Sequence, residues 1–177
     1  MLLNLQRSLA KLDICAKTIL LFEKISKTEY PPSKKPVMVW DGTCGFCQYW
    51  TSRWQHFTEQ KVGYDPYQEC SNHFKDIDIK HFKEASRLIE TDGTIYNGPR
   101  SAYRTFTYGS KWGFLDSWYE KYSWFEKLSD VLYNWVAKNR SLMFKITKAM
   151  FGSDPDQVRP FWVVYIMIVL YLIYTFV

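Results

Sequence analysis

The most informative segment of this chain is Asp41-Gly42-Thr43-Cys44-Gly45-Phe46-Cys47. It follows an unbroken apolar run at residues 37–40, which is typical of a strand buried on both faces. After it, aromatic residues recur at helical spacing between Phe46 and Phe57, which predicts a helix beginning at Gly45. The two cysteines are therefore expected at a strand-to-helix turn.

A Cys-x-x-Cys at such a turn is the arrangement that a dithiol–disulfide redox centre needs. A helix N-terminus stabilises a thiolate and lowers its pKa, and the two intervening residues let the second sulfur reach the first. We expect Cys44 to be the nucleophile that attacks a substrate disulfide and Cys47 to be the resolving thiol. The expected partners are protein thiols or disulfides.

Asp41 lies three residues before Cys44 and has two interpretations. As a catalytic residue, its carboxylate would take or give the proton of Cys47. As a structural residue, it would cap the following helix by accepting hydrogen bonds from free backbone amides. The spacing is compatible with both roles.

The coarse order of predicted elements is strand, helix, strand, helix, strand, strand, helix. The first two strands are expected to be parallel, with a right-handed crossover between them. Asp92-Gly93 predicts a hairpin turn between the last two strands. The predicted elements cover residues 37–40, 45–60, 62–65, 77–84, 85–91, 94–96 and 99–108.

Two features of the sequence support a family resemblance. The first is the Asp-x-x-Cys-x-x-Cys motif of Asp41, Cys44 and Cys47, and the second is residues 130–140, which end in Ala-Lys-Asn-Arg. On the basis of these two features, residues 37–145 resemble the DCC family of thiol-disulfide oxidoreductases. The resemblance implies a thioredoxin-like α/β fold and redox chemistry at the motif.

One departure weakens the analogy with thioredoxin-like enzymes. Such proteins generally place a cis-proline just before the third strand, facing the dithiol, whereas residues 83–87 contain no proline. Docking of a substrate backbone at this position is therefore not expected to follow the thioredoxin pattern.

A zinc site is the competing interpretation of the cysteines. Cys70 and His73 form a Cys-x-x-His, so Cys44, Cys47, Cys70 and His73 make a possible tetrahedral set of three thiolates and one imidazole. The main interpretation needs no metal or other cofactor. Bound zinc would abolish free dithiol chemistry.

The charge distribution argues against nucleic-acid binding. The net charge is +5, but residues 1–36 carry seven Lys or Arg against three acidic residues, while the remainder carries sixteen against fifteen. The excess therefore belongs to an N-terminal arm rather than to a groove in the domain.

Both ends of the chain have the character of membrane-directed segments. Residues 160–177 contain no charged side chain and predict a short C-terminal transmembrane helix. Lys145, Lys148 and Arg159 precede it, which places the domain on the cytoplasmic or matrix side of a bacterial or mitochondrial inner membrane. The first residues predict a basic amphipathic helix, either a mitochondrial presequence or a retained surface helix.

The predicted organisation is an arm and Pro-rich linker (1–36), a thioredoxin-like domain (37–150) and a transmembrane helix (160–177). Two functions remain open. The first is a membrane-anchored thiol-disulfide oxidoreductase; the second is a non-catalytic accessory subunit of a larger membrane complex. The second is favoured by the absent proline and by the twelve aromatic residues between Tyr103 and Trp135.

Overall fold

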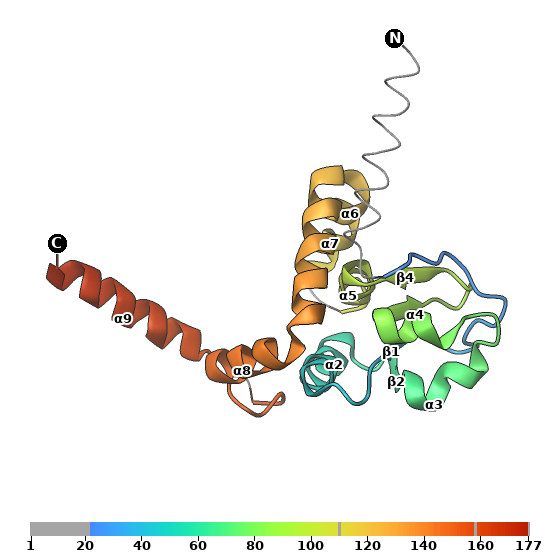
Figure 1. Ribbon diagram of the computed structural model, residues 1–177, viewed down its shortest axis with the longest axis horizontal. Coiled ribbons are helices and arrows are strands. Elements are labelled where there is room, and N and C mark those ends of the chain that lie inside the picture. The colour runs from blue at the N-terminus through green and yellow to red at the C-terminus, as the bar shows by residue number, and fades with distance from the viewer. Residues whose placement is uncertain (1–21, 110, 158, 177) are drawn as a thin grey trace, which may run out of the picture.

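Figure 1 shows a computed structural model, which describes residues 22–109, 111–157 and 159–176. The predicted N-terminal amphipathic helix lies mostly in residues 1–21, outside the described residues.

A small mixed sheet forms the centre of the molecule. Its strand order is β2-β1-β3-β4. β1 is parallel to β2, whereas β3 is antiparallel to both β1 and β4. The parallel pairing of the first two strands is as predicted. The strands are β1 (Val37–Trp40), β2 (Gly63–Pro66), β3 (Arg87–Ile89) and β4 (Ile95–Asn97).

Alternation along β1 divides the apolar side chains between the two faces of this sheet. Met38 packs with Leu88 and Tyr64 on one face, while Val39 packs with Ile89 on the other. All of these side chains are buried, as expected for a sheet covered on both sides. The sheet thus lies between two apolar clusters, one on each face.

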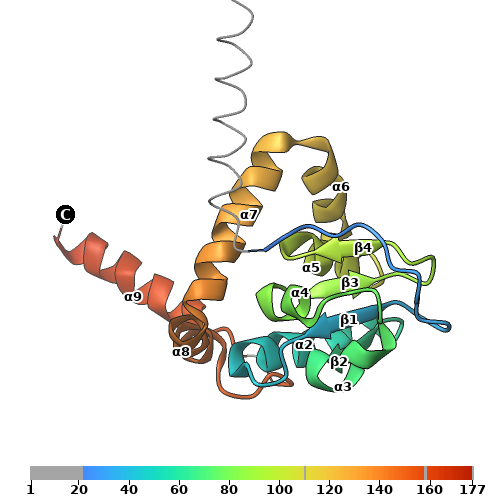
Figure 2. The same ribbon diagram turned by 45° about the vertical axis from the view of Figure 1, so that its right-hand side comes forward.

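The described part of the chain contains eight α-helices, only some of which pack against the sheet. α2 and α5 lie together on one side of the sheet, α3 and α4 lie near β1 and β2, and α6 and α7 form a projecting pair (Figure 2). The helices are α2 (Gly45–Thr58), α3 (Tyr67–Cys70), α4 (Ile79–Glu84), α5 (Pro99–Phe106), α6 (Phe114–Lys121), α7 (Ser123–Lys138), α8 (Arg140–Phe151) and α9 (Phe161–Phe176).

The segment that precedes β1 packs against the far edge of the sheet. Lys27 forms an antiparallel bridge with Thr94, and the N–H of Ile95 donates to the carbonyl of Ser26. The ring of Phe22 is buried and meets Tyr133 of α7 edge-on, with 5.4 Å between the ring centroids. Residues 22–28 therefore connect the sheet edge to α7.

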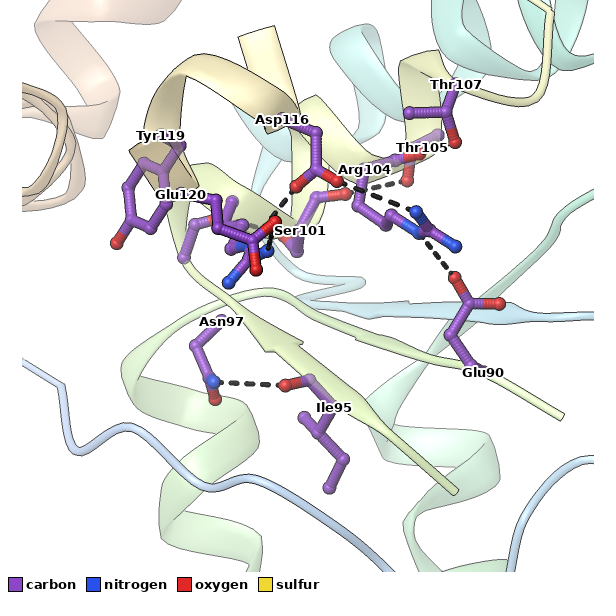
Figure 3. Close-up of polar contacts among 12 residues, drawn as sticks. Glu90, Ile95, Asn97, Ser101, Arg104, Thr105, Thr107, Asp116, Tyr119 and Glu120 are labelled. Atoms are coloured by element: carbon purple, nitrogen blue, oxygen red, sulfur yellow. Dashed lines mark hydrogen bonds and ion pairs between the residues drawn. The ribbon is translucent and has the colours of Figure 1, made fainter. Parts of the chain in front are cut away.

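Ion pairs hold α5 against the β3–β4 hairpin and α6. Arg104 donates to Glu90 at 2.8 Å and also lies 3.6 Å from Asp116 (Figure 3). Arg100 contacts the same Asp116 carboxylate at 3.1 Å. Glu90 and Asp116 are buried, so these contacts compensate carboxylates that would otherwise be costly to remove from water.

The predicted elements from β1 to α5 are present in the predicted order, and the structure adds the short helix α3 between β2 and α4. The predicted fold class, a thioredoxin-like domain with a C-terminal transmembrane helix, is wrong as a whole. The structure is instead a mixed α/β domain with a small sheet, to which α6, α7, α8 and α9 add a helical region about as long in sequence as the part that contains the strands. Within that region a helix was predicted at residues 160–177, whereas the apolar residues of α6 and α7 were assigned to surface contacts.

The membrane prediction is corrected by the length of the last helix. α9 has 16 residues, which at about 1.5 Å per residue spans about 24 Å against a hydrocarbon core of about 30 Å. Within residues 22–109, 111–157 and 159–176, no helix is both long enough and apolar enough to cross a bilayer. A single pass at 160–177, and the localisation drawn from it, are therefore not supported.

Candidate functional site

The two motif cysteines lie where β1 gives way to α2, and they form a disulfide with 5.2 Å between their Cα atoms. Cys44 is the N-cap of α2, and its sulfur accepts a hydrogen bond of 3.2 Å from the backbone N–H of Cys47. The first turn of α2 carries no acidic residue. In the reduced state these features favour a thiolate at Cys44, since its sulfur lies at a helix N-terminus and faces the N–H of Cys47.

Close packing under the turn explains the glycine that follows Asp41. A Cβ atom at Gly42 would lie 2.8 Å from the Cβ of Pro66, at the end of β2. The Gly42 N–H donates to the side-chain oxygen of Gln68 at 3.0 Å. The turn that presents Cys44 is therefore fixed against the neighbouring parallel strand.

Asp41 joins this turn to the helical region. Its Oδ1 accepts from the backbone and hydroxyl of Thr43 and from Gln68, and its Oδ2 accepts from Arg140 at 3.0 Å. Burial alone would raise the Asp41 pKa, but these hydrogen bonds and the Arg140 charge outweigh it and hold the pKa below its usual value. The carboxylate is therefore ionised at neutral pH.

The geometry gives Asp41 a clear structural role. It organises the turn before α2, although the N-cap position itself belongs to Cys44. Proton exchange with Cys47 is the other predicted role, and both side chains line one cavity. The structure thus places Asp41 and Cys47 at the same site.

The cavity beside the disulfide has a volume of about 370 Å³. It lies among α2, α5, α7 and the segment between α4 and β3, and Cys47 rather than Cys44 forms part of its wall. Most of the lining is aromatic or aliphatic. The lining residues are Trp40, Asp41, Phe46, Cys47, Trp50, Thr51, Trp54, Phe82, Ala85, Ser86, Pro99, Ala102, Tyr103, Phe106, Tyr133, Val136, Ala137 and Arg140.

Two hydroxyl groups in this wall are already engaged with one another. Ser101 donates to the carbonyl of Gly98 at 2.7 Å and can therefore accept the proton of Ser86, 2.9 Å away. Tyr133 accepts from the Ser86 N–H and can donate to the Ser86 hydroxyl at 3.2 Å. In this series of hydrogen bonds, the hydroxyl protons of Ser101, Ser86 and Tyr133 are each donated to a neighbouring oxygen. None of the three therefore remains to donate to a ligand.

The other residues of the predicted zinc set are not assembled with the disulfide. Cys70 is buried in the apolar cluster around Val39 and Phe74, where burial and the nearby Asp65 raise its pKa to about 12. His73 is exposed. In the part of the chain that the structure describes, three or more His, Cys, Asp or Glu side chains are nowhere grouped as metal ligands.

Sequence reasoning missed Arg140 and the cavity. Arg140 is separated from Asp41 by 99 positions, and only the packing of α8 against α2 brings the two together. The Ala-Lys-Asn-Arg sequence at residues 137–140 was noted as a family resemblance, and its last residue is this arginine. The aromatic spacing of α2 was also noted, and Phe46, Trp50 and Trp54 prove to line the cavity.

Comparison with known proteins gives no relative on which to base a function. No protein-family model, no curated protein and no solved structure matches this chain.

Proposed function

We propose that the protein is a thiol-disulfide oxidoreductase that works through Cys44 and Cys47. The observation that carries the proposal is the Cys44–Cys47 disulfide at the N-terminus of α2, beside a cavity. A structural disulfide buried in the core would be out of reach of a substrate sulfur. Cys44 and Cys47, by contrast, are both only partly buried. This partial exposure supports exchange of the pair with a partner.

The exchange balances as two displacements. In the reduced protein the Cys44 thiolate attacks one sulfur of a substrate disulfide, forming a mixed disulfide and releasing the first substrate thiolate. The Cys47 thiolate then attacks the Cys44 sulfur, which releases the second substrate thiolate and forms the intramolecular bond. The helix N-terminus and the Cys47 N–H favour Cys44 as the first nucleophile.

The charged pair beside the disulfide tunes this step. An isolated Asp41 carboxylate would disfavour a nearby thiolate, but Arg140 neutralises it at 3.0 Å. Arg140 is therefore a positioning residue, since it holds Asp41 and limits the negative potential at the cysteines.

Disulfide-reductase assays on a peptide disulfide, with glutathione as the electron source, test the proposal. We expect Cys44→Ser to abolish turnover, because the serine hydroxyl is a far weaker nucleophile than a thiolate. The matched control is Cys70→Ala, which also removes one thiol but lies in the packed cluster away from the disulfide. Turnover that survives in the Cys44→Ser variant would overturn the proposal.

A second function, as a subunit of a larger protein assembly, is supported by a different observation. Large apolar side chains on α6 and α7 are exposed to solvent, and exposed patches of this kind mark protein contacts. The exposed side chains are Phe114, Trp118, Trp124, Leu128, Val131, Leu132 and Trp135. Native gels of gently extracted protein would test this role, since migration as a single chain of 21.2 kDa would contradict it.

A further inference from the structure

We propose that the cavity beside Cys47 binds a quinone, which accepts the two electrons of the reduced Cys44–Cys47 pair. This inference rests on the proposed function, because it identifies the oxidant that would regenerate the disulfide. It is based on the size and lining of the cavity, on the polar groups in its wall and on its position relative to Cys47.

The size and lining of the cavity fit a flat ring with an apolar substituent. Its volume of about 370 Å³ falls within the roughly 300–1,000 Å³ range of small-molecule sites. Aromatic rings from α2 and α5 form much of the wall, and such rings favour stacking against another planar group. They are Phe46, Trp50, Trp54, Tyr103 and Phe106.

The residues of the wall include hydrogen-bond donors that have no partner within the described part of the chain. The indole nitrogens of Trp40 and Trp50 are buried and have no partner among the described residues. An unpaired buried N–H costs about 1–3 kcal/mol, so a ligand oxygen toward which either indole rotated would remove that cost. Arg140 adds a guanidinium, which has five N–H groups and contacts Asp41 through Nη1.

The acceptors in the same wall are largely occupied. Asp41 accepts four hydrogen bonds, and the Ser86 and Tyr133 hydroxyls belong to an ordered chain. A ligand that carries carbonyl acceptors and no donors therefore complements this wall. A quinone has that pattern, whereas a polypeptide segment would also bring backbone N–H groups that need acceptors.

The position of Cys47 connects this site to the redox pair. Cys47 lines the cavity and Cys44 does not, so the substrate disulfide and the quinone would approach different cysteines. The reaction balances without another reactant: the two thiols lose two electrons and two protons as the S–S bond forms, and the two quinone oxygens gain them to give a quinol. Arg140 would stabilise negative charge on the oxygen nearest to it.

Quinone reduction by the pre-reduced protein tests this assignment. The probe is a short-chain benzoquinone with every ring position substituted, so that a thiol cannot add to a ring carbon. We expect wild-type protein to reduce about one equivalent of probe and to recover the Cys44–Cys47 disulfide, as read by mass spectrometry after maleimide labelling. Cys47→Ser should not reduce the probe.

Filling the cavity separates specific binding from thiol reactivity. Ala102→Phe places a ring in the cavity and should lower the reduction rate about tenfold or more, the factor that corresponds to about 1.4 kcal/mol of steric cost. Ala149→Phe makes the same substitution on the exposed side of α8 and serves as the control. Ala137→Phe, on the α7 wall, replaces Ala102→Phe if that variant does not fold.

Binding has a readout that requires no electron transfer. The oxidised protein should show quenching of tryptophan fluorescence by the quinone, because Trp40, Trp50 and Trp54 line the cavity. The quenching should weaken in Ala102→Phe and persist in Ala149→Phe. Equal quenching and equal rates in the two variants would overturn the inference.

The same measurements distinguish failure of the quinone inference from failure of the proposed oxidoreductase function. If the wild-type pair equilibrates with glutathione but the quinone neither binds nor oxidises it, the quinone inference fails and the proposed function stands. If a peptide with an aromatic residue beside its disulfide binds more weakly to Ala102→Phe while the quinone has no effect, the cavity belongs to a polypeptide substrate instead. If the pair exchanges with neither partner, both proposals fail.

Discussion

The packed cluster around Cys70 and the cavity beside Cys47 show how differently one chain treats the same residue type. Cys70 is only 4% exposed, among Val39, Phe74 and Phe82. Cys47 faces a space bounded by aromatic rings and an ion pair. Both surroundings are rich in aromatic residues, so it is the packing of the surrounding helices that leaves one cysteine enclosed and the other beside a cavity.

The largest expected difference between the two regions is in stability. Phe74→Ala should lower the free energy of unfolding by about 3–5 kcal/mol, because it creates a void in a filled cluster. Phe46→Ala should cost about half as much, since Phe46 is only partly buried and already borders a cavity. Urea unfolding of the oxidised proteins measures both values. Equal losses would contradict the distinction between a packed and an open region.

Thiol alkylation sharpens the same comparison. After mild reduction, Cys44 and Cys47 should react with a maleimide more than about 100-fold faster than Cys70 in the folded protein, because burial raises the Cys70 pKa to about 12 and leaves little thiolate. Mass spectrometry of peptides from timed reactions assigns each site. Denaturant should remove the difference, and rapid labelling of Cys70 in the native protein would show that its cluster opens.

The ion pair beside the cavity should have a smaller effect. Arg140→Gln should cost about 1 kcal/mol at pH 7, since it removes a charge-assisted hydrogen bond that is only partly exposed. Because the pKa of Asp41 is lowered in the folded state, its stabilisation is complete above its ordinary pKa of 3.8 and is lost as the pH falls through the folded value.

The pH dependence provides the control for that variant. The difference in unfolding free energy between wild type and Arg140→Gln should shrink as the pH falls below the Asp41 pKa. Lys145→Gln removes a positive charge from an exposed position on the same helix and should have little effect at any pH. A pH-independent loss in Arg140→Gln would assign its role to packing rather than to charge.

Metal removal should have the smallest effect. A chelator is expected to leave the midpoint of thermal unfolding unchanged, since Cys70 and His73 do not join the two disulfide-bonded cysteines in a ligand group. Metal analysis of purified protein checks the result directly. About one zinc per chain, lost in Cys70→Ala, would instead support the structural zinc site.

Local order was predictable from local sequence. The unbroken apolar run at β1, the Asp92-Gly93 turn and Pro99 at the start of α5 each act over a few neighbouring residues. The same is true of the Cys-x-x-Cys, because its spacing alone brings the two sulfurs within reach of one another. Elements determined by nearest neighbours were therefore placed to within a few residues.

The length of the last helix was harder to predict from the sequence than its apolar character. The apolar nature of residues 160–177 was plain, but whether a segment can cross a bilayer depends on how many of its residues are helical, and α9 has 16. The exposed aromatic residues of α6 and α7 were also evident in the sequence. Their division into buried and exposed sets depended on which helices pack together.

The sequence by itself determined the position of the Cys44–Cys47 pair at a strand-to-helix turn and the order of the strands with α2, α4 and α5, because each follows from residue type and spacing. Tertiary structure alone decided that Arg140 would hold Asp41, that Cys70 would be buried away from the disulfide, and that α2, α5 and α7 would leave a cavity beside Cys47. These contacts join residues far apart in the chain, and helix packing rather than local preference brings such residues together.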